Sequence, residues 1–174
     1  MLRKFDTTRT HADNVKLASL TAIVAGLVNI VSFILFFSFT SNVTGYYAII
    51  IAELVKGNFH QFLIVALWVS SFFFGCFTSN FIVIYFNKYN TYWAHALPIL
   101  LEILSLLSIG LYGQFYYENT LIETEIMILI MLFAMGLQNG LTASISNFTV
   151  KTTHLTGATT DLAILASMFT HKEY

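Results

Sequence analysis

Three long stretches of this chain contain no Lys, Arg, Asp or Glu: residues 17–52, 57–87 and 126–150. A helix needs about 20 consecutive apolar residues to cross the roughly 30 Å hydrocarbon core of a bilayer, and each stretch is long enough. Two shorter charge-free stretches flank the single Glu102 and together form another candidate span, 89–101 with 103–117. This pattern predicts a chain that crosses a membrane several times.

The pattern also favours helices over a barrel. The chain is 57% hydrophobic and 10% charged, whereas a soluble domain carries about 25% charged residues. In lipid every backbone polar group must be paired, which leaves only helices and closed barrels. Barrel strands alternate polar and apolar residues over about ten positions, but runs such as 126–133 are continuously apolar. We therefore expect an all-α integral membrane protein.

Gly, Asn, Thr and charged residues divide the chain into hydrophobic segments. We expect six transmembrane or partly re-entrant helices, at about 17–39, 43–56, 62–86, 92–115, 126–146 and 155–170. The second and sixth are short for full crossings. No linker interrupts the array, so the sequence predicts an N-terminal flank over 1–16 and one polytopic membrane domain over 17–170.

The positive charges of the N-terminal flank predict the orientation. Arg3, Lys4, Arg9 and Lys16 all lie before the first segment, and positive charges favour the cytoplasmic side. Six crossings would then place Lys56 inside and Lys88 outside. We expect a multi-pass protein with a cytoplasmic N-terminus.

A polar pattern occurs twice in the chain. Gly26-Leu27-Val28-Asn29 precedes a polar Thr44-Gly45 break, and Gly136-Leu137-Gln138-Asn139 precedes a Thr156-Gly157 break. The Asn-to-Gly distances are 16 and 18 residues. The pattern predicts repeat units of about 17–86 and 126–170 joined by a linker helix over 92–115, as in many transporter folds. The alternative is that these residue types recur for helix packing alone.

Charged and amide side chains inside the spans are the candidate functional residues. A charge at the bilayer centre costs roughly 2.5–3.5 kcal/mol on insertion scales, and Glu102 lies near the middle of the fourth segment. His95 is two helical turns earlier on the same face, so the two predict either a proton-responsive site or a protonated, hydrogen-bonded Glu102. Asp161 follows the second break and is a candidate for lining a cavity. Asn29, Gln138 and Asn139 predict either interhelical hydrogen bonds, worth about 0.6–2 kcal/mol each, or solute contacts.

Three blocks of the sequence resemble a known family. Gly26 to Gly45, Met135 to Gly140 and Lys151 to Leu162 are similar to the YoaK-type family, a bacterial group of polytopic membrane proteins without an established function. The resemblance runs from about Ala18 to Ala166 and implies a bacterial inner-membrane location. Members usually carry an acidic residue in place of Asn29. They also usually continue into another span after the last block, so we expect the second repeat unit to be incomplete.

Several classes of function are disfavoured by the same sequence. The net charge of −1 leaves no basic patch for nucleic acid. Cys76 is the single cysteine, which excludes an internal disulfide and a cysteine-based metal site. Enzymatic motifs, metal-ligand spacings and phosphate loops are absent from the sequence, so we expect no enzyme, no cofactor and no metal.

Two functions remain. The first is a small-solute or ion transporter, whose expected binding or translocation residues are Asn29, Thr44, Gly45, Glu102, Gln138, Asn139, Thr156, Gly157 and Asp161. The second is a non-transporting membrane scaffold or accessory subunit. The expected partners are the lipid bilayer and either a second copy of the chain or another membrane protein.

Overall fold

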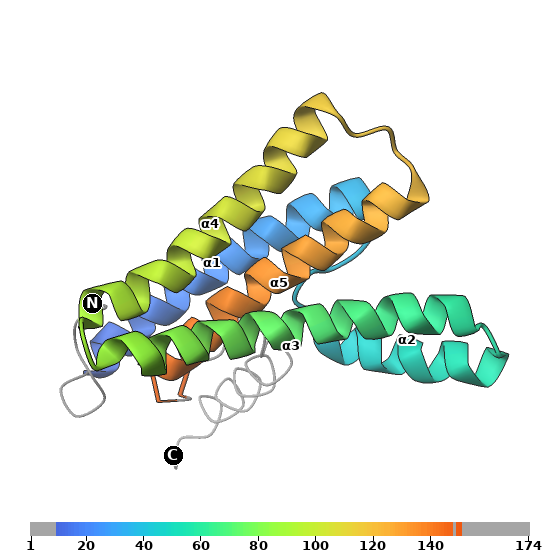
Figure 1. Ribbon diagram of the computed structural model, residues 1–174. Helices are drawn as coiled ribbons and strands as arrows, with labels where there is room; N and C mark the ends of the chain where they lie inside the picture. Colours follow the sequence, from blue (N-terminus) through green and yellow to red (C-terminus); the bar gives the residue numbers. More distant parts are fainter. Residues whose placement is uncertain (1–9, 148, 151–174) are drawn as a thin grey trace, which may run out of the picture.

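The computed structural model describes residues 10–147 and 149–150 (Figure 1). Within those residues the chain is entirely helical apart from its connections, which confirms the all-α class. The helices are α1 (His11–Phe36), α2 (Val43–Lys56), α3 (Phe59–Asn87), α4 (Thr91–Phe115) and α5 (Leu121–Ile145). The expected sixth segment, 155–170, lies outside the described residues.

Polar caps set where the helices begin. The Thr10 hydroxyl accepts a hydrogen bond from the Asp13 backbone N–H, and the Asp13 carboxylate accepts from the Thr10 backbone N–H. Thr120 and Glu123 form the same reciprocal pair at the start of α5. Each pair satisfies backbone donors that a helix start leaves without partners. Because of the first pair, α1 begins at His11 and takes in part of the expected N-terminal flank.

Four helices, α1, α3, α4 and α5, are long and apolar enough to cross a membrane. The remaining helix, α2, has 14 residues. At 1.5 Å per residue it is about 21 Å long, which is less than the thickness of the hydrocarbon core. The described chain is thus a multi-pass helical membrane protein with four candidate spans.

The connection between α1 and α2 differs from the expected Thr-Gly break. Thr44 and Gly45 lie in the first turn of α2, and the break is formed by residues 37–42. The reason is a cap: the Asn42 side chain accepts from the Gly45 backbone N–H at 3.2 Å. A Cβ on residue 45 would stand 2.9 Å from Asn42 Nδ2, so glycine leaves room for this cap.

The centre of the bundle is α5. In its most apolar window 61% of residues are buried, against 17–28% in the other three spans. Glycines bring α5 against α3: a Cβ on Gly136 would stand 2.3 Å from the Phe72 carbonyl oxygen, and one on Gly75 2.2 Å from that of Phe133. Small residues at an interface let two helix backbones approach closely. The α3–α5 contact is therefore made backbone to backbone.

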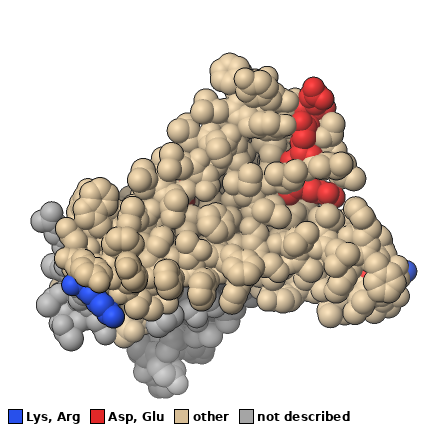
Figure 2. Space-filling view, viewed as in Figure 1, with Lys and Arg blue, Asp and Glu red and all other residues tan. Residues whose placement is uncertain are grey.

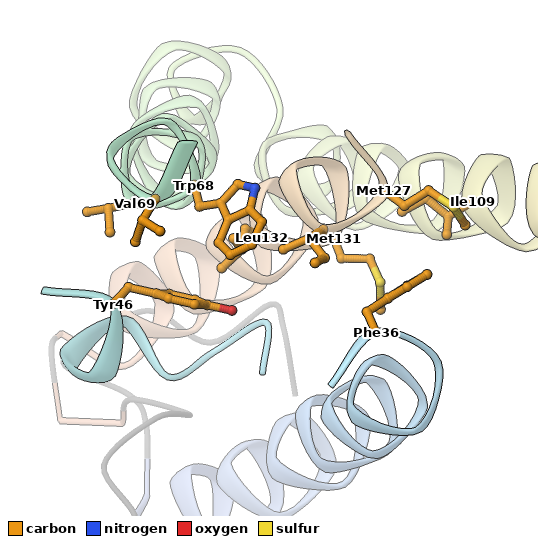
Figure 3. Packing of buried hydrophobic residues seen from close by; sticks show 10 residues of the cluster. Phe36, Tyr46, Trp68, Val69, Ile109, Met127, Met131 and Leu132 are labelled. Carbon is orange, nitrogen blue, oxygen red and sulfur yellow. The ribbon is translucent and has the colours of Figure 1, made fainter. Parts of the chain in front are cut away.

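Two apolar clusters show which helix ends lie together. Leu17, Val83, Leu141 and Ile145 form one, which joins the start of α1 to the ends of α3 and α5. We call this the N-terminal end of the bundle. The other cluster lies toward the opposite end, where the end of α1 meets α4 and the start of α5; it includes Phe36, Tyr46, Trp68, Val69, Ile109, Met127, Met131 and Leu132 (Figure 3).

This arrangement changes the expected position of Lys88. Lys88 follows α3 directly and therefore lies at the N-terminal end of the bundle, near the start of α1 (Figure 1). The six-crossing expectation placed it on the side opposite the N-terminus, because that expectation counted segment 43–56 as a crossing. The corresponding helix α2 is too short for one.

Charged side chains lie mostly at the ends of the bundle. Figure 2 shows acidic side chains gathered where α4 passes into α5, basic ones near the turn from α3 to α4, and an uncharged surface between them. At the end of α2, Lys56 donates to Glu53 at 2.6 Å, and this hydrogen bond lowers the pKa of the Glu53 carboxyl. The one described acid in the middle of a span is Glu102.

Candidate functional site

Glu102 and Gln138 form a buried polar pair between α4 and α5. Gln138 Nε2 donates to Glu102 Oε1 at 3.1 Å, and the two residues are 6% and 7% exposed respectively. Gln138 Oε1 is buried and accepts no hydrogen bond from the described residues. A buried acceptor without a partner costs about 1–3 kcal/mol. The pair therefore contains one satisfied contact and one open acceptor.

The pair lies in the wall of a groove of about 320 Å³ between α1, α4 and α5. The lining residues are Leu17, Leu20, Thr21, Val24, Ile99, Glu102, Ile103, Leu106, Gln138, Leu141, Thr142 and Ile145. Leu20 and Ile103 are 58% and 54% exposed, so the groove opens sideways between α1 and α4. In a membrane that opening faces lipid. We call this cavity the Glu102 groove.

Two threonines add hydroxyl groups to the groove. Thr21 Oγ1 donates to the Leu17 carbonyl oxygen, and Thr142 Oγ1 donates to that of Gln138, both at 2.8 Å. Donation to a carbonyl one turn earlier is the usual way for a threonine to satisfy its hydroxyl inside a membrane helix. Both hydroxyl protons are thus committed, and each hydroxyl oxygen still has lone pairs.

Sequence reasoning did not identify Thr21 and Thr142 as site residues, although helical spacing carries a signal for both. Thr142 lies four residues after Gln138, and Thr21 lies three residues before Val24, so each shares a helix face with another lining residue. What the spacing lacks is the information that these faces of α1 and α5 meet α4.

His95 is buried like Glu102, but it lines a neighbouring groove. That second groove contains Tyr92 and Trp93 and shares Ile99 and Ile103 with the Glu102 groove. Sequence reasoning placed His95 and Glu102 on one helix face. The structure buries both and places them in adjacent grooves.

Asn29 holds the connection between α1 and α2. Its Oδ1 accepts from the backbone N–H of Thr40 at 3.0 Å and of Ser41 at 3.1 Å. Its Nδ2 donates to Ser41 Oγ. These contacts use both ends of the amide to fold residues 40–41 back against α1. Asn29 therefore acts within the described residues as a clamp on the connection, and the Thr44-Gly45 pair belongs to the start of the next helix.

Asn139 belongs to the α3–α5 contact. Its side chain lies beside Cys76 of α3, and one residue later a Cβ on Gly140 would stand 2.7 Å from the Cys76 carbonyl oxygen. Of the predicted site residues, the structure thus brings Glu102 and Gln138 together, and it leaves Asn29 at the α1–α2 connection and Asn139 at the α3–α5 contact. Thr156, Gly157 and Asp161 lie outside the described residues.

Comparison with known families matches residues 17–174 to DUF1275, which is described as a protein of unknown function. The match covers most of the chain. This protein belongs to the DUF1275 family. The YoaK-type group is a DUF1275 family, so the resemblance found in the sequence is confirmed. No curated protein and no solved structure matches this DUF1275 protein.

Proposed function

We propose that this DUF1275 protein moves a small solute or an ion across its membrane, and that Glu102 takes part by binding and releasing a proton. The observation that supports the proposal is the Glu102–Gln138 pair in the wall of a groove, with Gln138 Oε1 left open. Ionisable side chains within a span are rare and are associated with proton relays and substrate pathways.

The hydrogen-bonding chemistry of the pair gives two distinct states. A protonated carboxyl both accepts and donates, so it can pair with both ends of the Gln138 amide. An ionised carboxylate only accepts, which leaves Gln138 Oε1 open for another donor. Proton binding would thus close the pair, and proton release would expose two acceptors to the groove. No other titratable side chain among the described residues lines this groove.

Flux measurements test the proposal. The full chain is reconstituted in liposomes that contain a pH-sensitive dye, and proton movement is followed with a panel of solutes and ions outside. We expect Glu102→Gln to lower coupled flux roughly tenfold or more, the loss that follows when an essential proton carrier is removed. Glu118→Gln, at an exposed position between α4 and α5, serves as the matched control and should behave as wild type. Wild-type flux equal to that of empty liposomes would overturn the proposal.

The orientation is part of the proposal. Among the described residues the N-terminal end of the bundle carries Lys16 and Lys88, and the α4–α5 end carries Glu118, Glu123 and Glu125. We propose that the N-terminal end faces the cytoplasm of a bacterium and that the acidic end faces outward.

Cysteine labelling in cells tests this orientation. In a Cys76→Ala background, a membrane-impermeant maleimide should label Glu118→Cys in intact cells and Lys88→Cys only after permeabilisation. The reverse pattern would overturn the orientation. Labelling of both positions from one side would overturn the crossing of α4.

The second candidate is a scaffold or accessory subunit. Asn29, one of the residues expected to contact a solute, is engaged in the α1–α2 connection. The outer faces of α1 and α3 carry many exposed large apolar side chains, which suit contact with another membrane protein as well as with lipid. Purification in mild detergent should then recover a stoichiometric membrane partner, and recovery of the lone chain would count against this candidate.

A further inference from the structure

The polar groups of the Glu102 groove are almost all hydrogen-bond acceptors. The hydroxyl protons of Thr21 and Thr142 are committed to backbone carbonyls, and one amide N–H of Gln138 is committed to Glu102. The acceptors that remain are Gln138 Oε1, the carboxyl of Glu102 and the lone pairs of the two threonine hydroxyls. The second amide N–H of Gln138 is the one further side-chain donor. A ligand that donates hydrogen bonds fits this lining.

The charge of the groove also favours a ligand that donates hydrogen bonds. Glu102 is its one ionisable residue, and none of the described lining residues is Lys, Arg or His. When Glu102 gives up its proton, the groove holds one negative charge with no basic side chain beside it. A buried charge is strongly unfavourable unless it is paired. A cation with N–H donors would neutralise the Glu102 carboxylate and would also donate hydrogen bonds to the acceptors of the groove.

The apolar walls of the groove determine which non-polar part of a ligand can fit there. Eight of the twelve lining residues are Leu, Ile or Val, and the four polar ones are Glu102, Gln138 and the two threonines. The volume of about 320 Å³ lies at the small end of the range for small-molecule sites. The sideways opening past Leu20 and Ile103 connects the groove to lipid, so a ligand that partitions into the bilayer can enter.

We propose that the Glu102 groove binds a lipophilic amine, with its ammonium group between the Glu102 carboxylate and Gln138 Oε1 and its hydrocarbon part against Val24 and Ile103. This inference rests on the proposed function and names the substrate class for the same site. The ammonium and the proton compete for Glu102: when the amine binds as its cation, the proton leaves Glu102, and when the proton returns the amine is released.

Equilibrium binding tests the inference. The full chain is placed in lipid nanodiscs and titrated with 1-adamantylamine by calorimetry, with empty nanodiscs as the reference for partition into lipid. We expect saturable binding, and roughly tenfold or weaker binding for Glu102→Gln because the ammonium loses its counter-charge. The neutral analogue 1-adamantanol keeps the hydrocarbon cage and a donor but lacks the charge. It should bind roughly tenfold more weakly than the amine.

A steric pair of variants keeps the test independent of the buried polar residues. Val24→Trp places a large ring in the groove and should abolish saturable binding. Ile23→Trp changes the neighbouring residue on α1, which is exposed and does not line the groove, and should bind as wild type. Amine uptake equal to that of empty nanodiscs, equal binding of the alcohol, or wild-type binding by Val24→Trp would each overturn the inference.

Failure of the inference can be told apart from failure of the proposed function. Amine binding that depends on Glu102, without any flux in liposomes, would overturn translocation and leave the binding site. Proton flux that depends on Glu102, without amine binding, would overturn the amine as the substrate and leave the role of Glu102 in proton movement.

Discussion

In α1, Gly26 faces open space, whereas in α5 Gly136 lies against the backbone of α3, although both glycines begin the same Gly-x-x-Asn motif. The asparagines differ as well. Asn29 holds the connection after its own helix, and Asn139 lies beside Cys76 of a neighbouring helix. One local pattern therefore has two structural roles. Helix–helix packing decides between them, because α5 is enclosed by other helices and α1 is largely exposed.

The largest expected difference between the two motifs is at the glycines. Gly136→Leu should destabilise the protein by about 3 kcal/mol or more, since overfilling a close contact costs typically 1–3 kcal/mol and occasionally more, and here the added Cβ meets the Phe72 carbonyl oxygen. Gly26→Leu adds a side chain in open space and should change stability by less than about 1 kcal/mol. The measurement is the fraction of monodisperse protein that remains after heating in detergent. Equal losses for both variants would contradict the comparison.

The next expected effect is at the first asparagine. Asn29→Leu removes the acceptor for the Thr40 and Ser41 backbone N–H groups and should cost about 1–3 kcal/mol. The loss should be local to the connection, so hydrogen exchange should rise over residues 37–42 more than in α3 or α5. Unchanged exchange in this connection would show that Asn29 does not hold it.

The Glu102–Gln138 pair is a contact of the second motif alone, because Gln138 precedes Asn139 in that motif. Gln138→Leu or Glu102→Leu alone leaves a buried polar partner unpaired and should cost about 1–3 kcal/mol. The double variant removes both groups, and its unfolding free energy should lie closer to wild type than the sum of the single losses. Additive losses in a double-mutant cycle would argue against a direct contact.

The smallest expected effect is that of Asn29→Asp. A carboxylate retains the acceptor that binds Thr40 and Ser41 N–H, and the Ser41 hydroxyl can turn to donate to it. We therefore expect stability within about 1 kcal/mol of wild type, far from that of Asn29→Leu. The same heating assay compares the two.

Much of the helical layout could be predicted from the sequence. The expected segments 43–56 and 92–115 agree closely with α2 and α4, because charged and polar residues mark helix ends. Helix α1 begins before the expected segment 17–39, because the Thr10–Asp13 cap starts the helix at His11. The break after α1 lies before Thr44-Gly45, because Asn42 caps α2 and both residues of this pair belong to its first turn. The count of six transmembrane or partly re-entrant helices and the internal repeat remain predictions, since the sixth segment lies outside the described residues.

The candidate site was predictable only as separate residues. Glu102 stood out because a charge inside an apolar run is costly, and Gln138 because an amide inside a span needs a partner. Their pairing joins residues 36 positions apart on two helices, and no local pattern carries that information. Thr21 and Thr142 enter the site for the same reason.

Taken by itself, the sequence determined that this chain is a helical membrane protein, because transfer from water to lipid and backbone pairing within a helix depend on composition over about 20 consecutive residues. Only the tertiary structure decided which glycine lies in a helix contact, which asparagine clamps a connection, and which amide oxygen stays open beside Glu102. Those outcomes depend on distances between helices, and such distances are set by the packing of side chains that lie far apart in the chain.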